Sequence, residues 1–173
     1  MDCKSIYDLP REKLIEMIQS LARNCVAIDG VWFQSVEEKE GYAQAMEHDK
    51  NAWRRFSPIE ALRIQALLSL PEKAGAEGLA RALAFRFNSI HNEVEITAEE
   101  NSVLYRVVTC RVQAARERKQ LPYHACRPVA EIEYSEFAKV IDPRFETEIL
   151  SCHPDVVDNT CHCACRFTLK ECD

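Results

Sequence analysis

The spacing of the apolar residues changes near residue 92, and this change constrains the fold more than any other feature of the chain. Between residues 14 and 21 apolar side chains recur every three or four positions, which is the period of an amphipathic helix. Between residues 94 and 98 they alternate with polar residues, which is the period of a strand. We therefore expect an α+β fold, with a helical half (1–92) packed on an α+β half (93–173).

Helix-breaking residues divide the first half. A helix is expected to start near Pro10, and Gly30 is expected to interrupt it. A second short helix should then break at Gly41. Residues 42–70 carry apolar positions suited to a long helix, which Pro58 should bend or split.

The second half has the pattern of an antiparallel sheet partly covered by helices. The expected order is two strands (94–98, 103–110), two helices (111–120, 129–141) and two strands (145–152, 162–170). No repeat, low-complexity tract or linker interrupts the chain. A single domain of ββ-αα-ββ type over residues 1–173, with its first half helical, follows from this order.

Composition excludes two classes of partner. A net charge of -6 argues against a nucleic-acid backbone as ligand, because such binding depends on clustered Lys and Arg. No apolar run approaches the roughly 20 residues of a membrane span, and residues 1–4 lead into no signal-peptide core. We therefore expect a cytoplasmic protein that has no nucleic-acid or membrane partner.

Thiols and imidazoles gather in the second half. Most of the nine cysteines lie at or after residue 110, and three histidines lie among them. Four of these cysteines fall at expected ends of strands or starts of helices, where distant segments can converge on one edge of a sheet. This preferred ligand set is Cys110, Cys126, Cys152 and Cys163, with Cys165 and His153 as alternates.

Zinc or an iron–sulfur cluster is the cofactor that such a thiol set predicts. The separations of 16, 26 and 11 residues match no standard zinc or ferredoxin motif. Two other interpretations stay open: cysteines that pack as small apolar side chains, and a nucleophilic thiol such as Cys126 activated by His124.

A polar and aromatic group lies in the helical half. Asp29, Trp32 and Glu37 form a candidate pocket wall, in which a carboxylate would bind or protonate a ligand. The alternative is an aromatic stripe that belongs to the core. The chain has only four glycines and no phosphate-binding loop or serine-nucleophile elbow, so standard nucleotide-binding enzymes and serine hydrolases are not expected.

Several segments resemble an uncharacterised family of small prokaryotic cytosolic proteins, which carries only a domain-of-unknown-function label. The segments are residues 29–33 with 37–38, 53–56 with 60–61, 110–113, 126–129, 142–144, and Cys163 with 167–169. More remotely, the cysteine-rich half is similar to the L-2-amino-thiazoline-4-carboxylate hydrolase group and to four-vinyl-reductase-type domains of the TRAPP-like fold. That resemblance implies helices on an antiparallel sheet, a pocket for a small organic molecule and the same four cysteines as the site.

Three functions follow as hypotheses. The leading one is a cytosolic metal-binding protein with a small-molecule pocket. The second is a cysteine-dependent hydrolase that acts on C–N bonds of amide or thiazoline type. The third is a non-catalytic ligand sensor or scaffold, for which a second copy of the chain is a candidate partner.

Overall fold

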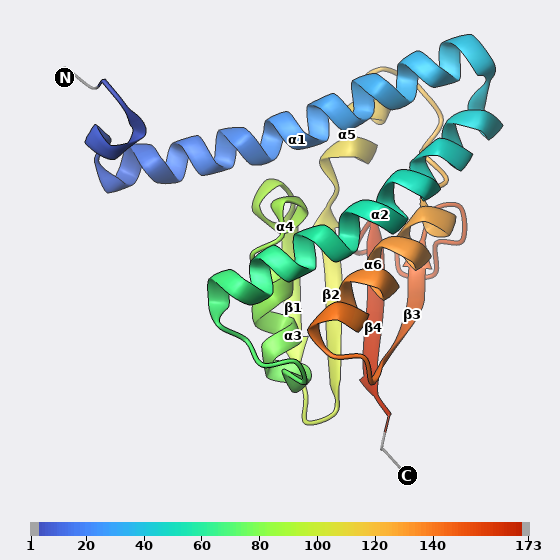
Figure 1. The fold of residues 1–173 in the computed structure, drawn as a ribbon. Coiled ribbons are helices and arrows are strands. Elements are labelled where there is room, and N and C mark those ends of the chain that lie inside the picture. Colours follow the sequence, from blue (N-terminus) through green and yellow to red (C-terminus); the bar gives the residue numbers. More distant parts are fainter. Residues whose placement is uncertain (1–3, 171–173) are drawn as a thin grey trace.

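The computed structural model describes residues 4–170 and shows helices packed on one side of a four-stranded sheet (Figure 1). The helical elements are η1 (Ile6–Asp8), α1 (Arg11–Glu40), α2 (Tyr42–Leu68), α3 (Gly75–Ala84), α4 (Phe87–His91), α5 (Arg111–Arg118) and α6 (Arg127–Ile141). The strands are β1 (Glu93–Ala98), β2 (Ser102–Thr109), β3 (Phe145–Cys152) and β4 (Cys163–Leu169). The expected α+β class is confirmed.

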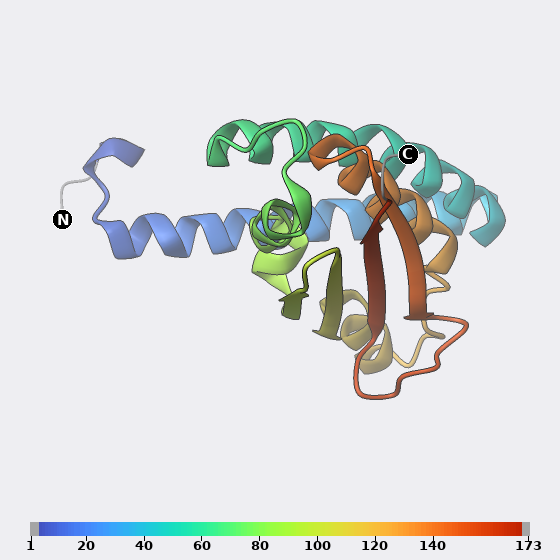
Figure 2. The same cartoon turned by 90° about the horizontal axis from the view of Figure 1, so that it is seen from below.

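The sheet is antiparallel throughout, in the order β1-β2-β4-β3. The predicted strands begin and end within one residue of the observed ones, and two helices lie between the two strand pairs as expected. Helices α2, α3 and α6 lie over one face of the sheet (Figures 1 and 2). On the opposite face, Asp158 and Thr160 of the loop after β3 contact Arg106 of β2. The ββ-αα-ββ order therefore places β4 in the middle of the sheet, beside β2.

The long helices α1 and α2 form an antiparallel pair that meets at Gly41. Gly41 has a φ of 87°, a backbone conformation that glycine adopts without a steric penalty, so the chain can reverse there. The expected break at Gly30 is wrong, because α1 runs through it to Glu40. A glycine inside a helix costs only about 1 kcal/mol relative to alanine, and packing of α1 on α2 and α4 outweighs that cost. Similarly, α2 continues through Pro58 as one helix and is not split.

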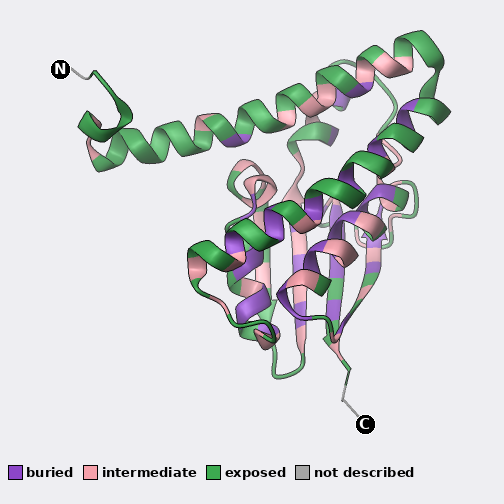
Figure 3. Ribbon diagram, in the orientation of Figure 1, coloured by how far each residue is buried: buried purple, intermediate pink, exposed green. Residues whose placement is uncertain are grey.

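The core lies between the sheet and the helices. Its fully buried side chains include Leu79 and Leu83 of α3, Phe137 and Ile141 of α6, and Phe167 of β4. Each such burial contributes about 1.5–3 kcal/mol. Figure 3 shows the buried residues on the facing sides of α2, α6 and the strands, whereas the N-terminal part of α1 is exposed.

A buried ion cluster joins the helices above the core. Arg86, fully buried before α4, donates to Glu60 of α2 over 2.9 Å, and its Nη2 atom lies 2.7 Å from Glu133 of α6. The other oxygen of Glu60 accepts the backbone N–H of Phe87, the first residue of α4. One guanidinium therefore ties α2, α4 and α6 together.

Candidate thiol site

The four preferred cysteines come from four different elements. Cys110 and Cys126 are the N-cap residues of α5 and α6. Cys152 is the last residue of β3, and Cys163 is the first residue of β4. Helix N-termini carry partial positive charge, which favours an anionic thiolate over a neutral thiol.

The structure brings these cysteines together in contacting pairs. The Sγ atoms of Cys126 and Cys152 lie 3.3 Å apart, within a hydrogen bond. Cys152 stands directly opposite Cys163 in the β3–β4 register. Cys110 is near enough to Cys126 for a negative charge on either thiol to act on the other. Residues separated by as many as 53 positions therefore form one thiol group, in which Cys152 and Cys163 are buried and Cys110 and Cys126 are partly buried.

All four thiols have raised pKa values. The hydrogen bond to Cys152 and burial raise the pKa of Cys126 far above its usual range. Burial raises that of Cys110. The hydrogen bond to Cys126 lowers the pKa of Cys152, but the hydrogen bond to Cys163 and burial outweigh it and raise the pKa. The hydrogen bond to Cys152 likewise lowers the pKa of Cys163, and burial with the charges of nearby thiols outweighs it. Without a bound cation the group is therefore neutral.

The fit of a metal ion to these residues depends on how the thiols are oriented. Within residues 4–170, no three side chains of His, Cys, Asp or Glu are placed so that they surround a metal ion as they stand. The thiols face each other in pairs, so a shared ion requires side-chain rotation. The donor chemistry suits zinc or iron–sulfur, since thiolates are the ligands that these centres prefer.

The loop before α6 is held by Gln113, a side chain that the sequence analysis did not single out. Its amide donates to the carbonyl of His124 over 2.9 Å and accepts the N–H of the same residue over 3.0 Å. The amide nitrogen also lies 3.5 Å from Cys126 Sγ. Gln113 is 1% exposed, so it orients the Cys126 loop from within the protein. A glutamine among charged helix residues gave no periodic signal that would have revealed it.

The ring of His124 contacts the α1–α2 pair. Its Nδ1 lies 3.3 Å from the hydroxyl of Tyr42, its Nε2 lies 3.7 Å from the carboxylate of Asp49, and it packs edge-on against Phe33. Its contact with Cys126 is through the backbone, where the Cys126 N–H donates to its carbonyl over 2.9 Å. The predicted Cys126–His124 pair therefore adjoins in space, but the imidazole is occupied by partners on α2.

The alternate ligands lie to either side of the thiols. Cys165 is fully buried on β4, and burial together with the charge of Glu133 raises its pKa. The ring of His153 stacks on Tyr123, with centroids 4.4 Å apart. His162 directly precedes β4 and is partly buried, and its Nδ1 lies 3.2 Å from the backbone nitrogen of Cys110 and 2.9 Å from the carbonyl of Val108.

The residues of the predicted pocket wall all lie on α1, but they have different surroundings. Burial, with the negative charges of Asp49 and Glu133, raises the pKa of Asp29 to about 7. Trp32 is 48% exposed and packs edge-on against His48. Glu37 lies 4.0 Å from Arg116 of α5.

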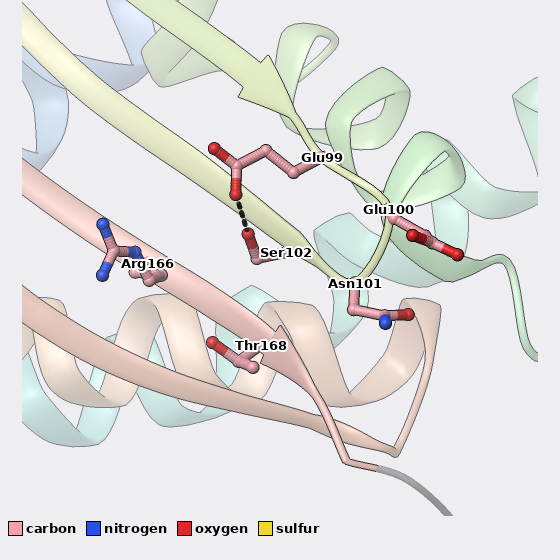
Figure 4. A pocket seen from close by; sticks show the side chains of 6 residues that line it. All are labelled: Glu99, Glu100, Asn101, Ser102, Arg166 and Thr168. Carbon is pink, nitrogen blue, oxygen red and sulfur yellow. Dashed lines mark hydrogen bonds between the residues drawn. The ribbon is translucent and has the colours of Figure 1, made fainter.

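Two hollows lie on the face of the sheet opposite the helices, away from these residues. The first, of about 480 Å³, surrounds the β1–β2 turn, where Ser102 donates to Glu99 over 2.9 Å and Arg166 of β4 lies nearby (Figure 4). The second, of about 170 Å³, lies beside Arg106 and Asp158. Neither is lined by a residue of the thiol site or of the predicted pocket wall.

Comparison with known proteins places the chain in a family. Residues 7–169 match a family described as "Family of unknown function (DUF6125)". The chain belongs to this family. The DUF6125 match extends over both the helical half and the thiol site, so it agrees with the predicted resemblance to an uncharacterised family. No curated protein and no solved structure matches the chain. Among residues 4–170, no helix combines the length and apolar character needed to cross a membrane.

Proposed function

We propose that this protein binds a soft metal, as zinc or an iron–sulfur cluster, through Cys110, Cys126, Cys152 and Cys163. The observation that carries the proposal is the 3.3 Å distance between the Sγ atoms of Cys126 and Cys152. Two thiols from a helix start and a strand end meet inside the protein, and the other two preferred cysteines adjoin them.

The Cys126–Cys152 sulfur spacing is compatible with a shared ion once the other thiols rotate towards it. Thiolates about 2.3 Å from a tetrahedral zinc are about 3.8 Å from one another, whereas the sulfurs of a disulfide are about 2.05 Å apart. The observed distance is closer to the first value. Binding must also remove the thiol protons, which the raised pKa values otherwise hold in place, so metal uptake should release protons and weaken at low pH.

The surroundings of Cys126 count against a nucleophilic thiol. A cysteine hydrolase needs a thiolate beside a base. Here the pKa of Cys126 is raised, and the His124 ring is engaged by Tyr42 and Asp49. The hydrolase acting on C–N bonds is therefore the second candidate, supported by the Cys126–His124 proximity. A TRAPP-like arrangement and a small-molecule ligand belong to the proposal through the remote resemblance, and a cytoplasmic location belongs to it through the sequence pattern.

Metal loading tests the proposal. Protein purified without oxygen is stripped with a chelator, and is then titrated with Zn²⁺, with Co²⁺ as a spectroscopic probe, or is reconstituted with iron and sulfide. We expect one centre per chain, thiolate-to-metal absorption with Co²⁺ or iron, and proton release in weakly buffered solution.

Matched variants separate this centre from adventitious binding. Cys126→Ser should abolish the thiolate absorption, whereas Cys25→Ser, at an exposed position on α1, should leave it unchanged. Equal loss in both variants, or no stoichiometric uptake of any of these metals, would refute the proposal. If the metal-free protein instead shows a single thiol at Cys126 that reacts rapidly with iodoacetamide, the hydrolase becomes the better interpretation.

A further inference from the structure

The N-terminal part of α1 projects beyond the rest of the protein (Figures 1 and 2). The residues of α1 that are fully packed are Ala22 and Phe33, and residues 11–19 are all exposed. A helical arm of this kind gains little stability from packing against its own chain. Its apolar residues therefore need another explanation, such as contact with a partner.

A continuous apolar stripe, the α1 seam, runs along this arm and onto the body of the protein. The seam consists of Leu14, Ile18, Leu21, Cys25, Ile28 and Trp32. Its spacing of four, three, four, three and four residues is that of a coiled-coil heptad. Its five large members are 36–67% exposed, and Cys25 is exposed as well. No charged residue interrupts the seam over about 27 Å of helix.

We propose that the α1 seam pairs with the α1 seam of a second copy of this chain, in an antiparallel arrangement. In antiparallel pairing the two alternating seam positions face each other. With the two-fold axis near Arg23, Leu14 faces the partner subunit's Trp32, Ile18 faces the partner's Ile28, and Leu21 faces the partner's Cys25. The six positions then form six complete layers, because the seam is symmetric about its own centre.

Charge favours this orientation over the parallel one. The first turn of α1 carries Arg11, Glu12 and Lys13, with a net charge of +1, whereas its last four residues, 37–40, carry three Glu and one Lys, with a net charge of -2. Antiparallel helices bring these opposite ends within about one turn of each other and align their dipoles favourably. Parallel helices would place the acidic ends together.

The area is sufficient for a dimer. Eight exposed apolar side chains lie on the seam and its flanks, and burying the exposed half of each removes roughly 50 Å² from water, or about 400 Å² per protomer. Interfaces are about 60% apolar, so each protomer would bury about 670 Å² in total. The sum, about 1,300 Å², lies within the range of roughly 1,200–2,000 Å² that stable complexes bury.

Sedimentation equilibrium tests the pairing in three forms of the full chain. We expect the unmodified protein to form dimers, and Ile18→Lys to raise the dimer dissociation constant at least a hundredfold. Gln19→Lys makes the same charge change on the same helix turn but off the seam, and it should leave the constant within a fewfold. Ile18 is 52% exposed, so circular dichroism should show all three forms folded. A monomeric unmodified protein, or an equal rise of the dissociation constant in both variants, would overturn the proposal. A monomer is also the result expected if the arm binds another protein or a lipid surface.

Crosslinking tests the orientation. Leu21→Cys should form an inter-chain disulfide under mild oxidation, and Leu21→Cys with Cys25→Ala should lose it, because position 21 faces position 25 of the partner. A crosslink that persists without Cys25 would indicate parallel pairing and would overturn the antiparallel arrangement.

Discussion

Replacing Arg86 with Met should show that one buried cation holds the helical layer together. The guanidinium is fully buried between the carboxylates of Glu60 and Glu133, at 2.9 and 2.7 Å. Methionine has a similar length and fills the site without charge, so the substitution leaves two facing carboxylates inside the protein with little change in packed volume.

The size of the effect follows from the burial of these groups. Removing one partner of a buried ion pair costs about 3–5 kcal/mol, because the remaining charge has no compensation. In a chain of this length each kcal/mol changes the melting temperature by roughly 2–4 °C, so Arg86→Met should lower it by roughly 6–20 °C. Removing the charges of the partners as well, in Arg86→Met with Glu60→Gln and Glu133→Gln, should recover at least half of that loss.

The pH dependence provides an independent check. Burial raises the folded-state pKa of Glu133 above 4.5 even though Arg86 lowers it, and without Arg86 the pKa should rise further. The folded variant then binds a proton that the unfolded chain lacks above pH 4.5, so its stability falls as the pH rises through the folded pKa. The difference in melting temperature between the unmodified protein and Arg86→Met should therefore shrink on acidification towards pH 4.5.

Differential scanning calorimetry from pH 4.5 to 8 measures all three forms. The reasoning would be refuted if Arg86→Met melted within 2 °C of the unmodified protein at neutral pH, since a buried charge pair cannot be broken at so small a cost. It would also be refuted if the triple variant were less stable than Arg86→Met alone.

Two further substitutions test local features. Gln113→Leu should destabilise the protein by about 2 kcal/mol and speed amide hydrogen exchange at His124, because two buried hydrogen bonds are lost. Arg118→Leu, at an exposed position on α5, should do neither. Unchanged exchange in Gln113→Leu would contradict the role of Gln113 in holding the loop. Asp142→Asn should cost about 1.5–3 kcal/mol at neutral pH, because the carboxylate accepts the Gly75 N–H and pairs with Arg144. Burial raises the pKa of Asp142, but these hydrogen bonds outweigh burial and lower the pKa below 3.8. The stabilisation by Asp142 is therefore present above pH 3.8, and the unmodified protein and Asp142→Asn should converge in stability on further acidification. A difference in stability that stays constant with pH would contradict this prediction.

The element order was predictable because periodicity is a local property. The alternation of side chains along a strand puts Cys163, Cys165 and Phe167 of β4 on one face, and all three are buried. The predicted break at Gly30 failed for a related reason. The prediction used the low helix propensity of glycine, which costs about 1 kcal/mol relative to alanine. It could not include the packing of α1 on its neighbours, which keeps the helix continuous through Gly30.

The sequence by itself determined where each thiol lies on its element, since that depends on residues a few positions apart. The tertiary structure alone decided that Cys126 Sγ meets Cys152 Sγ, that His124 turns to Tyr42 and Asp49, and that Arg86 joins α2 to α6. These contacts join segments 26 to 82 residues apart. They depend on how whole helix and sheet faces pack against each other, and a local sequence pattern does not predict that packing.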